Sequence, residues 1–350
     1  LAVLAASGAA MAQSSVTLYG VADAGVTYLN GADNWSGVTS GNNLTSRLGF
    51  RGVEDLGGGL KANFVIEGGF NLDNGDGASG YAGAKAGEGF QFKRRSTVGL
   101  SGGFGEVRLG RELTAAYNAT ARYDVFGSVG IGQSRLWADG GVVDASANAT
   151  AVTTNQRISN ALTYVSPDFS GFKFGLNYGF GETTASNSDS GYLGAGLTYD
   201  NGPLSLGLGL ERLNNGANSV AASDIDAWSL GGSYDFGVAK LLAGYRESKV
   251  DRATGENKRL GYYVAATAPV GAGTVRVSYN RYENELANVK GKADQFAIGY
   301  VYGLSKRTSV YGTYAYLKNK DGANLYTLGS GGLKTNGSQQ GVQVGVSHSF

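Results

Sequence analysis

Side chains that could carry covalent or acid–base chemistry are few in this 350-residue sequence. It has no cysteine, and its one histidine, His348, lies two residues from the C-terminus. A histidine-assisted nucleophile or a zinc site needs several such groups close together. Carboxylate pairs such as Glu54 with Asp55, or Asp224 with Asp226, fall in turns or at the ends of predicted strands. The sequence therefore predicts no enzyme, no metal site and no cofactor.

Two glycine motifs have the spacing of nucleotide-binding and hydrolase signatures. "GDGASG" at 75–80 fits G-x-G-x-x-G, but no amphipathic helix follows it. "GLSGG" at 99–103 fits G-x-S-x-G, but it joins two predicted strands rather than a strand and a helix. We interpret the first as loop glycine and the second as a turn.

The composition suits strands that do not enclose a dry core. Apolar residues make up 42%, and Gly contributes 59 residues, with 21 Tyr and 14 Phe but only 3 Pro. No run approaches the ~18 apolar residues of a spanning helix. Lys and Arg number 29 against 28 Asp and Glu, so the balance gives no reason to expect a nucleic-acid partner.

The first twelve residues, "LAVLAASGAAMA", have the apolar and small-residue pattern of a secretory signal peptide. We interpret 1–12 as a signal peptide remnant, with Ala10-Met11-Ala12 as its cleavage site, and 13–350 as the mature domain. Such a segment indicates export.

From Ser15 onward the polarity alternates in segments of about ten residues, the pattern of membrane β-barrel strands. In the last segment, Val342, Val344 and Val346 share one face with His348 and Phe350. The pattern predicts about sixteen strands, at 15–28, 43–54, 59–70, 91–101, 104–112, 156–166, 170–180, 190–200, 203–213, 223–235, 238–249, 257–268, 273–284, 292–302, 307–319 and 340–350.

The predicted connections alternate between short and long, which distinguishes the two ends of a barrel. All three prolines lie in short turns, where a missing N–H breaks no ladder bond: Pro167, Pro203 and Pro269. Long, polar links are predicted at 29–42, 71–90, 113–155, 285–291 and 318–339.

The predicted strands are apolar on one face only, and the sequence has no second set of apolar segments to cover that face. This excludes the core of a β-sandwich. In lipid every backbone polar group must be paired, and for strands only a closed ring achieves this. The fold class is therefore all-β, a transmembrane antiparallel up-and-down barrel whose strand number leaves an aqueous channel. Tyr residues near strand ends, such as Tyr164, Tyr199 and Tyr300, suit the girdles at the lipid headgroups.

Several segments together resemble one known family. They are "SSVTLYGVADAGVTY" at the start, "SRLGFRGVEDLGGGLKANFVIEGGF" at 46–70, "RRSTVGLSGGFGEVRLGRE" at 94–112, "NQRISNALTYVSPDFSGFKFGLNYGF" at 155–180 and the terminal "GVQVGVSHSF". Over 14–350 the chain resembles the general porins of betaproteobacteria. The resemblance implies a homotrimeric outer-membrane diffusion channel for small hydrophilic solutes, often anion-preferring, narrowed by its third external loop.

The resemblance places a basic ladder on the barrel wall, formed by Arg47, Arg94 and Arg157, with Arg51, Arg95 and Arg108 as further candidates. If Leu48 and Phe50 face lipid, Arg47 and Arg51 face the lumen. Outward Ile158, Leu162 and Tyr164 turn Arg157 inward in the same way. The family motif matches Arg94, whereas alternation with Val98 and Leu100 favours Arg95. The alternative for each arginine is a solvated position on the wall or partnership with a nearby carboxylate such as Glu67 or Glu106.

The energies agree with inward arginines. An arginine facing lipid at the midplane costs ~2–4 kcal/mol. One arginine attracts an anion 7 Å away by roughly 2.4 kcal/mol at an effective dielectric of 20. We therefore expect mild anion preference.

The longest link, 113–155, is expected to fold inward and set the pore radius, with Asp124, Asp139 and Asp144 as its acidic groups. The alternative is an external loop. Phe350 and His348 resemble the C-terminal signal read by the barrel assembly machinery. The alternative is a strand that happens to end in an aromatic residue.

Three other functions stay open at this point. A barrel enzyme is disfavoured by the place of His348, and a Gly-rich β-helix by the lack of a fixed repeat. A substrate-specific channel with an aromatic sugar track, using Tyr19, Tyr117 and Tyr123, remains possible.

Overall fold

A computed structural model of the chain describes residues 15–77, 89–138, 156–181, 191–214, 224–252, 255–286, 289–323, 326–330, 332 and 334–350. Predicted segments at 1–12 and beyond Ala138 in the long link lie outside these ranges. No helix among the described residues is long and apolar enough to cross a membrane.

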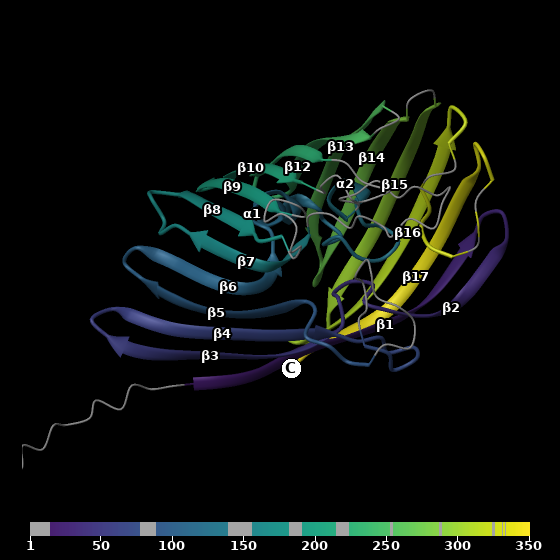
Figure 1. Cartoon of the computed structure of the whole chain (residues 1–350). Helices are drawn as coiled ribbons and strands as arrows, with labels where there is room; N and C mark the ends of the chain where they lie inside the picture. The colour runs from purple at the N-terminus through teal and green to yellow at the C-terminus, as the bar shows by residue number, and fades with distance from the viewer. Residues whose placement is uncertain are drawn as a thin grey trace, which may run out of the picture.

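Seventeen antiparallel strands close into one ring (Figure 1), as the alternating sequence predicted. Their bounds are β1 (Ser15–Asn30), β2 (Asn34–Ser40), β3 (Arg47–Gly57), β4 (Leu60–Gly69), β5 (Arg95–Gly102), β6 (Gly105–Leu113), β7 (Arg157–Val165), β8 (Phe172–Gly179), β9 (Tyr192–Asn201), β10 (Leu204–Leu213), β11 (Ile225–Asp235), β12 (Lys240–Arg252), β13 (Gly255–Val270), β14 (Gly273–Leu286), β15 (Val289–Gly303), β16 (Thr308–Lys320) and β17 (Ser338–Ser349).

The ring has sixteen positions, because β2 and β3 share one. One edge of β1 pairs with β3 over Ser15–Val21 and with β2 over Ala24–Asn30, while the other edge pairs with β17. Between β2 and β3 the chain turns around the Asp23 carboxylate, which accepts the backbone N–H groups of Asn42, Asn43 and Leu44. The prediction of about sixteen strands in a closed antiparallel barrel is confirmed.

Two of the predicted long links are wrong. Residues 34–40, inside the expected link at 29–42, form β2 and extend the first hairpin. In the expected link at 285–291, residues 285–286 belong to β14 and residues 289–291 to β15, which pair as far as Leu286 with Val289. In both places polar residues continue the ladder, because β-strands that project from a membrane no longer need apolar side chains.

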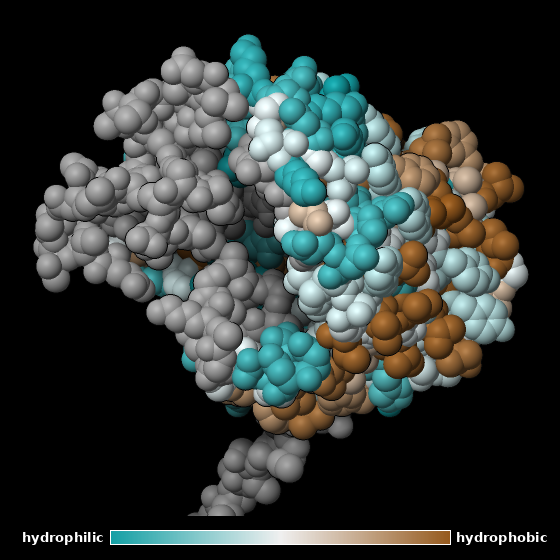
Figure 2. Space-filling view, turned by 90° about the vertical axis from the view of Figure 1, so that its right-hand side faces the viewer, coloured by the Kyte–Doolittle hydropathy of each residue, from teal (hydrophilic) through white to brown (hydrophobic). Residues whose placement is uncertain are grey.

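The side chains alternate between two environments along the strands. On β11, Trp228 and Leu230 are exposed on the outer surface, whereas Ala227 and Ser229 are buried on the inner one. Figure 2 shows hydrophobic residues gathered toward the lower and right-hand part of one side of the barrel and hydrophilic residues toward its upper part. An apolar exterior around a polar interior is the arrangement of a barrel in a membrane.

Two short helices lie inside the ring, in the segment that follows β6 (Figure 1). They are α1 (Ala115–Thr120) and α2 (Arg135–Ala138), with a 3-10 turn at Ala121–Tyr123 between them. The buried apolar cluster forms where this segment meets the inner surface of the barrel. The interior is thus divided into a packed side and an open side.

Candidate functional site: the barrel lumen

The open side of the lumen is lined by the inner face of β3–β7, and the predicted arginines gather there. Strand pairing places Arg95 directly opposite Glu67, and Gly49 opposite Glu67 on the other side. Arg47 is two residues from Gly49 on the same face of β3, so it is a diagonal neighbour of Glu67. Val98 and Leu100, which alternate with Arg95, are exposed on the lipid side. On β5 the charged Arg95 therefore faces the water-filled lumen, and the apolar Val98 and Leu100 face lipid.

Glu67 is the centre of the first group of charges. Arg94 Nε lies 2.7 Å from Glu67 Oε1, and Arg47 Nε lies 3.6 Å from Glu67 Oε2. The Tyr19 hydroxyl donates to Glu67 Oε2 at 3.0 Å. The tyrosine ring lies across Gly49, where a Cβ would be 2.6 Å from Tyr19 Cζ. Glycine at this position lets the ring lie flat on the wall and reach the carboxylate.

Arg94 and Arg95 both belong to the wall, so the choice between them does not arise. Arg94 precedes β5, where strand alternation does not apply, and its backbone N–H donates to Glu67 O. Arg95 faces inward on β5, where its Nε donates to Thr97 Oγ1 and its Nη2 lies 3.8 Å from Glu112 Oε2.

Arg157 lies beside Arg94, but the strand alternation that was used to predict its position does not hold. Its Nε donates to Arg94 O at 2.8 Å. The expected outward position of Ile158 is wrong, because a Cβ on inward-facing Gly179 would contact Ile158 Cδ1. The ladder between β6 and β7 shifts register between Gly110 and Glu112, and Asn160 has a positive φ of 51°. A β-bulge of this kind reverses the alternation that the sequence argument assumed.

Arg108 forms the second group of charges with two glutamates. Its Nη1 lies 2.8 Å from Glu106 Oε2 and its Nη2 lies 2.8 Å from Glu112 Oε2. Arg51 is exposed to the lumen, and its guanidinium carbon lies 5.2 Å from the centre of the Tyr19 ring. The carboxylate partnership weighed for each arginine is thus present for Arg47, Arg94, Arg95 and Arg108.

Counted over its described residues, the arginine wall keeps a positive excess. We define the arginine wall as Arg47, Arg51, Arg94, Arg95, Arg108 and Arg157 with Glu67, Glu106 and Glu112. Six guanidinium groups against three carboxylates leave three positive charges. Carboxylates in contact orient the guanidinium groups and reduce, but do not cancel, the field in the lumen.

The opposite side of the lumen is covered by the segment 114–138, which we call the inner loop. Helix α1 lies on β9–β11 at a row of glycines. A Cβ at Gly196 or Gly207 would collide with the carbonyl groups of Ala115 or Ala119, and one at Gly231 with the Tyr123 ring. These glycines remove side chains from the wall, and the helix backbone occupies the space that they leave.

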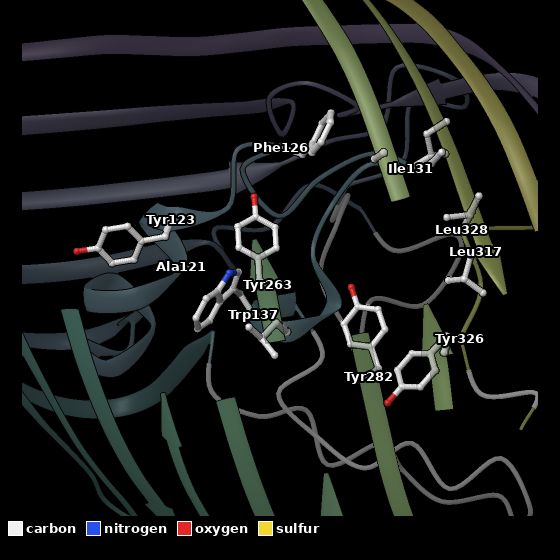
Figure 3. Close-up of a cluster of buried hydrophobic side chains, with 14 of the residues drawn as sticks. Ala121, Tyr123, Phe126, Ile131, Trp137, Tyr263, Tyr282, Leu317, Tyr326 and Leu328 are labelled. Atoms are coloured by element: carbon white, nitrogen blue, oxygen red, sulfur yellow. The ribbon is translucent and has the colours of Figure 1, made fainter. Parts of the chain in front are cut away.

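The second half of the inner loop is held by polar groups of the far wall (Figure 3). The Tyr263 hydroxyl accepts the Val125 N–H at 2.8 Å, and the Tyr282 hydroxyl accepts the Arg135 N–H at 2.7 Å. Gln343 on β17 accepts the Ile131 N–H at 3.3 Å. The inner loop thus follows the wall from β8 to β17, and Figure 3 shows Phe126 and Trp137 lying near Tyr263.

Asp124 lies in the inner loop, but its carboxylate does not face open water. The side chain is 6% exposed and accepts the N–H groups of Phe126, Ser128 and Ser134, each at 2.9 Å. Burial raises the pKa of Asp124, and these three donors oppose that effect. Asp124 therefore ties the loop together, while Asp139 and Asp144 lie outside the described residues.

Sequence reasoning missed two arginines on the packed side. Arg276 donates to Val125 O at 3.1 Å and to Asn43 Oδ1 at 3.0 Å, and lies 4.8 Å from the Phe126 ring centre. Arg246 pairs with Glu211 at 2.8 Å beside the Tyr192 hydroxyl. The alternation that identified Arg47 would have found both, because each lies between outward-facing residues on its strand.

The three tyrosines considered for a sugar track do not form one. Tyr123 is 1% exposed and hydrogen-bonds Ser205 in the wall. Tyr117 is half-buried against the apolar cluster, and Tyr19 lies between Glu67 and Arg51. No group of three or more potential metal ligands occurs among the residues that the structure describes.

The C-terminus closes the ring. Phe350 and Gly20 exchange two backbone hydrogen bonds of 3.1 Å, and the Phe350 ring is exposed on the outer surface beside Gly20. His348 Nδ1 lies 2.9 Å from Thr308 Oγ1 on the neighbouring strand. Both side chains are thus on the exterior, where another protein or lipid can contact them.

Comparisons with known proteins agree with this geometry. The sequence profile of a Gram-negative porin family matches residues 1–322. Outer membrane porin protein 32 of Delftia acidovorans is 44% identical, covering 100% of this chain and 98% of that protein. An outer membrane porin of Bordetella pertussis is 34% identical, covering 89% and 91%.

Among solved structures, an anion-selective porin from Comamonas acidovorans superposes with a TM-score of 0.83 at 41% identity. The match covers 97% of this chain and 100% of that one. An OmpF from Salmonella typhi, 18% identical with a TM-score of 0.69 over 96% of this chain and 97% of that one, shares the fold.

Proposed function

Since the chain belongs to the Gram-negative porin family, we propose that small hydrophilic solutes diffuse through its lumen and that anions pass more readily than cations. The protein is an outer-membrane porin, a passive channel. The observation that carries the anion preference is the arginine wall, with its excess of three positive charges on the open side of the lumen. The relative described as anion-selective supports the same direction.

The inner loop sets the minimum width of the channel in this proposal. It fills the side of the lumen along β8–β17, so solutes pass between it and the arginine wall. Its described acid, Asp124, is occupied by backbone donors and adds little negative charge to that passage. The described part of the loop carries two arginines, Arg122 and Arg135, and no carboxylate besides Asp124. It therefore sets no exposed carboxylate against the predicted ladder of Arg47, Arg94 and Arg157.

Three further features belong to the same proposal. The protein assembles as a homotrimer, which is supported by a trimeric form among the solved structures of this fold. Export uses residues 1–12 as a signal peptide. The barrel assembly machinery recognises the exterior Phe350 and His348, whose outward placement leaves them accessible. A passive channel needs no catalytic residue.

Reversal potentials across a planar bilayer in a salt gradient test the anion preference. We expect anion selectivity that falls toward neutrality in the double variant Arg47→Ala with Arg157→Ala. The matched control is Arg212→Ala with Arg281→Ala, which removes two positive charges outside the lumen. Arg212 is paired with outward Leu193, and Arg281 is paired with outward Tyr262. Cation selectivity of the native protein, or no change in the double variant, would contradict the proposal.

The dependence of conductance on salt concentration separates general diffusion from a specific channel. Linear dependence is expected for a lumen without a binding site. Saturation at low concentration would instead favour the substrate-specific alternative.

A further inference from the structure

Residues 41–46 connect β2 to β3 and project into the interior of the barrel. The last residue of β2 pairs with Ala24 and the first residue of β3 pairs with Val21, so only Ala22 and Asp23 lie between them on β1. The connection at 41–46 is longer than this gap requires. Its Asn43 side chain reaches Arg276 on β14, although β15, β16, β17 and β1 separate the two around the ring. We call residues 41–46 the strut.

The strut is shaped by the Asp23 carboxylate, which is fully buried. This carboxylate accepts the backbone N–H groups of three successive residues, Asn42 at 2.7 Å, Asn43 at 3.2 Å and Leu44 at 3.0 Å. The Tyr311 hydroxyl on β16 also donates to it at 2.8 Å. Hydrogen bonds to a carboxylate are among the stronger ones in proteins, and three from successive residues fix the backbone of the strut.

Arg276 joins the strut to the tip of the inner loop, which we define as residues 125–131. One guanidinium group donates to Asn43 Oδ1 at 3.0 Å and to Val125 O at 3.1 Å. Its central carbon lies 4.8 Å from the centre of the Phe126 ring. A planar guanidinium presents its donors in a rigid arrangement. Arg276 therefore holds the strut and Val125 at a fixed separation.

Gln343 on β17 makes a second connection, at the other end of the tip. Its Nε2 donates to Asn42 Oδ1 at 2.7 Å, and its Oε1 accepts the Ile131 N–H at 3.3 Å. The backbone at Gly130 is in direct contact with the strut, because a Cβ there would collide with Asn42 O. Gly130 also has a φ of 68°, which favours glycine. The strut thus meets both ends of the tip.

The end of the strut that leads into β3 belongs to the arginine wall. Arg47 follows the strut directly as the first residue of β3, and its Nη1 lies 3.5 Å from Thr45 O. The same guanidinium lies 3.6 Å from Glu67. The strut therefore contacts the arginine wall on one side and the inner loop on the other. Its dimensions determine how far apart these two surfaces are beside Arg47.

The space behind the tip is filled. The inward-facing Ala297 on β15 and Ala315 and Leu317 on β16 are 0% exposed. The Phe126 ring covers Gly299, where a Cβ would lie 3.0 Å from Phe126 Cε1. Because this packing is close, the tip has no room to move further toward β15 and β16. A tip that is released can move only toward the arginine wall and into the passage.

We propose that the strut is a spacer that holds the channel open, and that Asn42, Asn43 and Arg276 are the residues that position the tip. This inference rests on the proposed role of the inner loop in setting the width of the channel. Without these contacts the tip approaches the arginine wall and narrows the passage. The consequence concerns the size of the solutes that pass and does not depend on their charge.

Liposome swelling with neutral sugars tests the strut without involving anion preference. Asn42→Ala with Asn43→Ala removes the side-chain contacts and keeps the backbone N–H groups on Asp23. We expect the rate for a disaccharide, relative to that for a monosaccharide, to fall about twofold or more, because selectivity by size depends on pore diameter. Arg276→Met should lower the ratio in the same direction, since it releases Asn43 and Val125 together.

Asn30→Ala with Asn34→Ala is the matched control and should keep the native ratio. These two exposed asparagines lie at the outer end of the hairpin of β1 and β2, where the Asn30 side chain donates to Asn34 at 2.8 Å. A further variant replaces the tip, 125–131, by a Gly-Gly link. If the strut acts through the tip, Asn42→Ala with Asn43→Ala should have no effect on the sugar ratio in this shortened loop. Heat-modifiable gel mobility verifies that each variant is folded.

Single-channel conductance of the shortened variant separates this inference from the proposed function. The conductance should rise above the native value, because less of the loop fills the lumen. A raised conductance together with native sugar ratios in the strut variants would overturn the strut alone, as would a lowered ratio that persists in the shortened loop. An unchanged conductance after the shortening would overturn both the strut and the proposed role of the inner loop.

Discussion

The two sides of the lumen differ in their side chains and in what covers them. The arginine wall on β3–β7 uses short strands and charged side chains that remain beside water. The wall on β9–β17 uses glycine, tyrosine and amide side chains, and a loop covers it. The charged side acts through long-range electrostatics, whereas the covered side acts through close packing. Both walls follow the same alternation of outward apolar and inward polar or small residues, and they differ only in which residues face inward.

Loss of the Asp124 carboxylate should have the largest effect on the covered side. Asp124→Ala leaves three N–H groups, two of them buried, without their acceptor, which costs about 3 kcal/mol. Urea unfolding of the barrel in lipid should show this loss, and single-channel records should become noisier. Asp168→Ala, in an exposed turn, is the control and should behave as the native protein. Quiet, native channels in Asp124→Ala would show that the loop does not depend on this carboxylate.

A side chain added to the glycine row beneath α1 should have the second-largest effect. Gly231→Val puts a branched side chain where the buried Tyr123 ring lies, and overpacking of this kind costs about 1–3 kcal/mol. Gly232→Val is a close control, because it faces outward and its nearest neighbour is the flexible Leu206 side chain at 3.1 Å. Equal urea midpoints for the two variants would argue against α1 as a tightly packed element.

On the charged side, neutralising Glu67 should sharpen the contrast between the walls. Glu67→Gln removes the negative charge that contacts both Arg47 and Arg94 and leaves a neutral hydrogen-bond acceptor in its place. We expect the ratio of anion to cation permeability to rise about two- to fivefold, or ~0.4–1 kcal/mol. Glu285→Gln, on the outer surface, provides the control for loss of one carboxylate. A fall in the ratio would mean that Glu67 mainly positions the arginines.

The smallest effect is expected for the Tyr19 hydroxyl. Tyr19→Phe removes one hydrogen bond to Glu67 and keeps the ring under Arg51, so unfolding should lose about 1 kcal/mol. Selectivity should change less than in Glu67→Gln, as measured by reversal potential. Tyr300→Phe, whose hydroxyl donates to a turn carbonyl, is the control. A larger change than in Glu67→Gln would give Tyr19 a direct role in permeation.

Strand positions could be predicted closely, whereas interruptions of the strands could not. Every predicted strand has a counterpart, because outward and inward environments impose period-two alternation. The bulge that turns Ile158 inward depends on a left-handed Asn160 and on the register with β6, which are properties of the pair of strands. Likewise, β2 projects beyond the region where lipid enforces the pattern.

The sequence by itself determined the ring, its two environments and the presence of arginines on the lumen side. These follow from local rules, since lipid accepts apolar side chains and excludes unpaired backbone. Only the tertiary structure decided which carboxylate meets which arginine, that Asp124 faces backbone donors rather than water, and that a glycine row supports α1. Those outcomes depend on contacts between segments far apart in the chain, such as Gly231 with Tyr123. Local alternation cannot encode them, because it fixes the side of the sheet on which a residue lies but not what lies opposite.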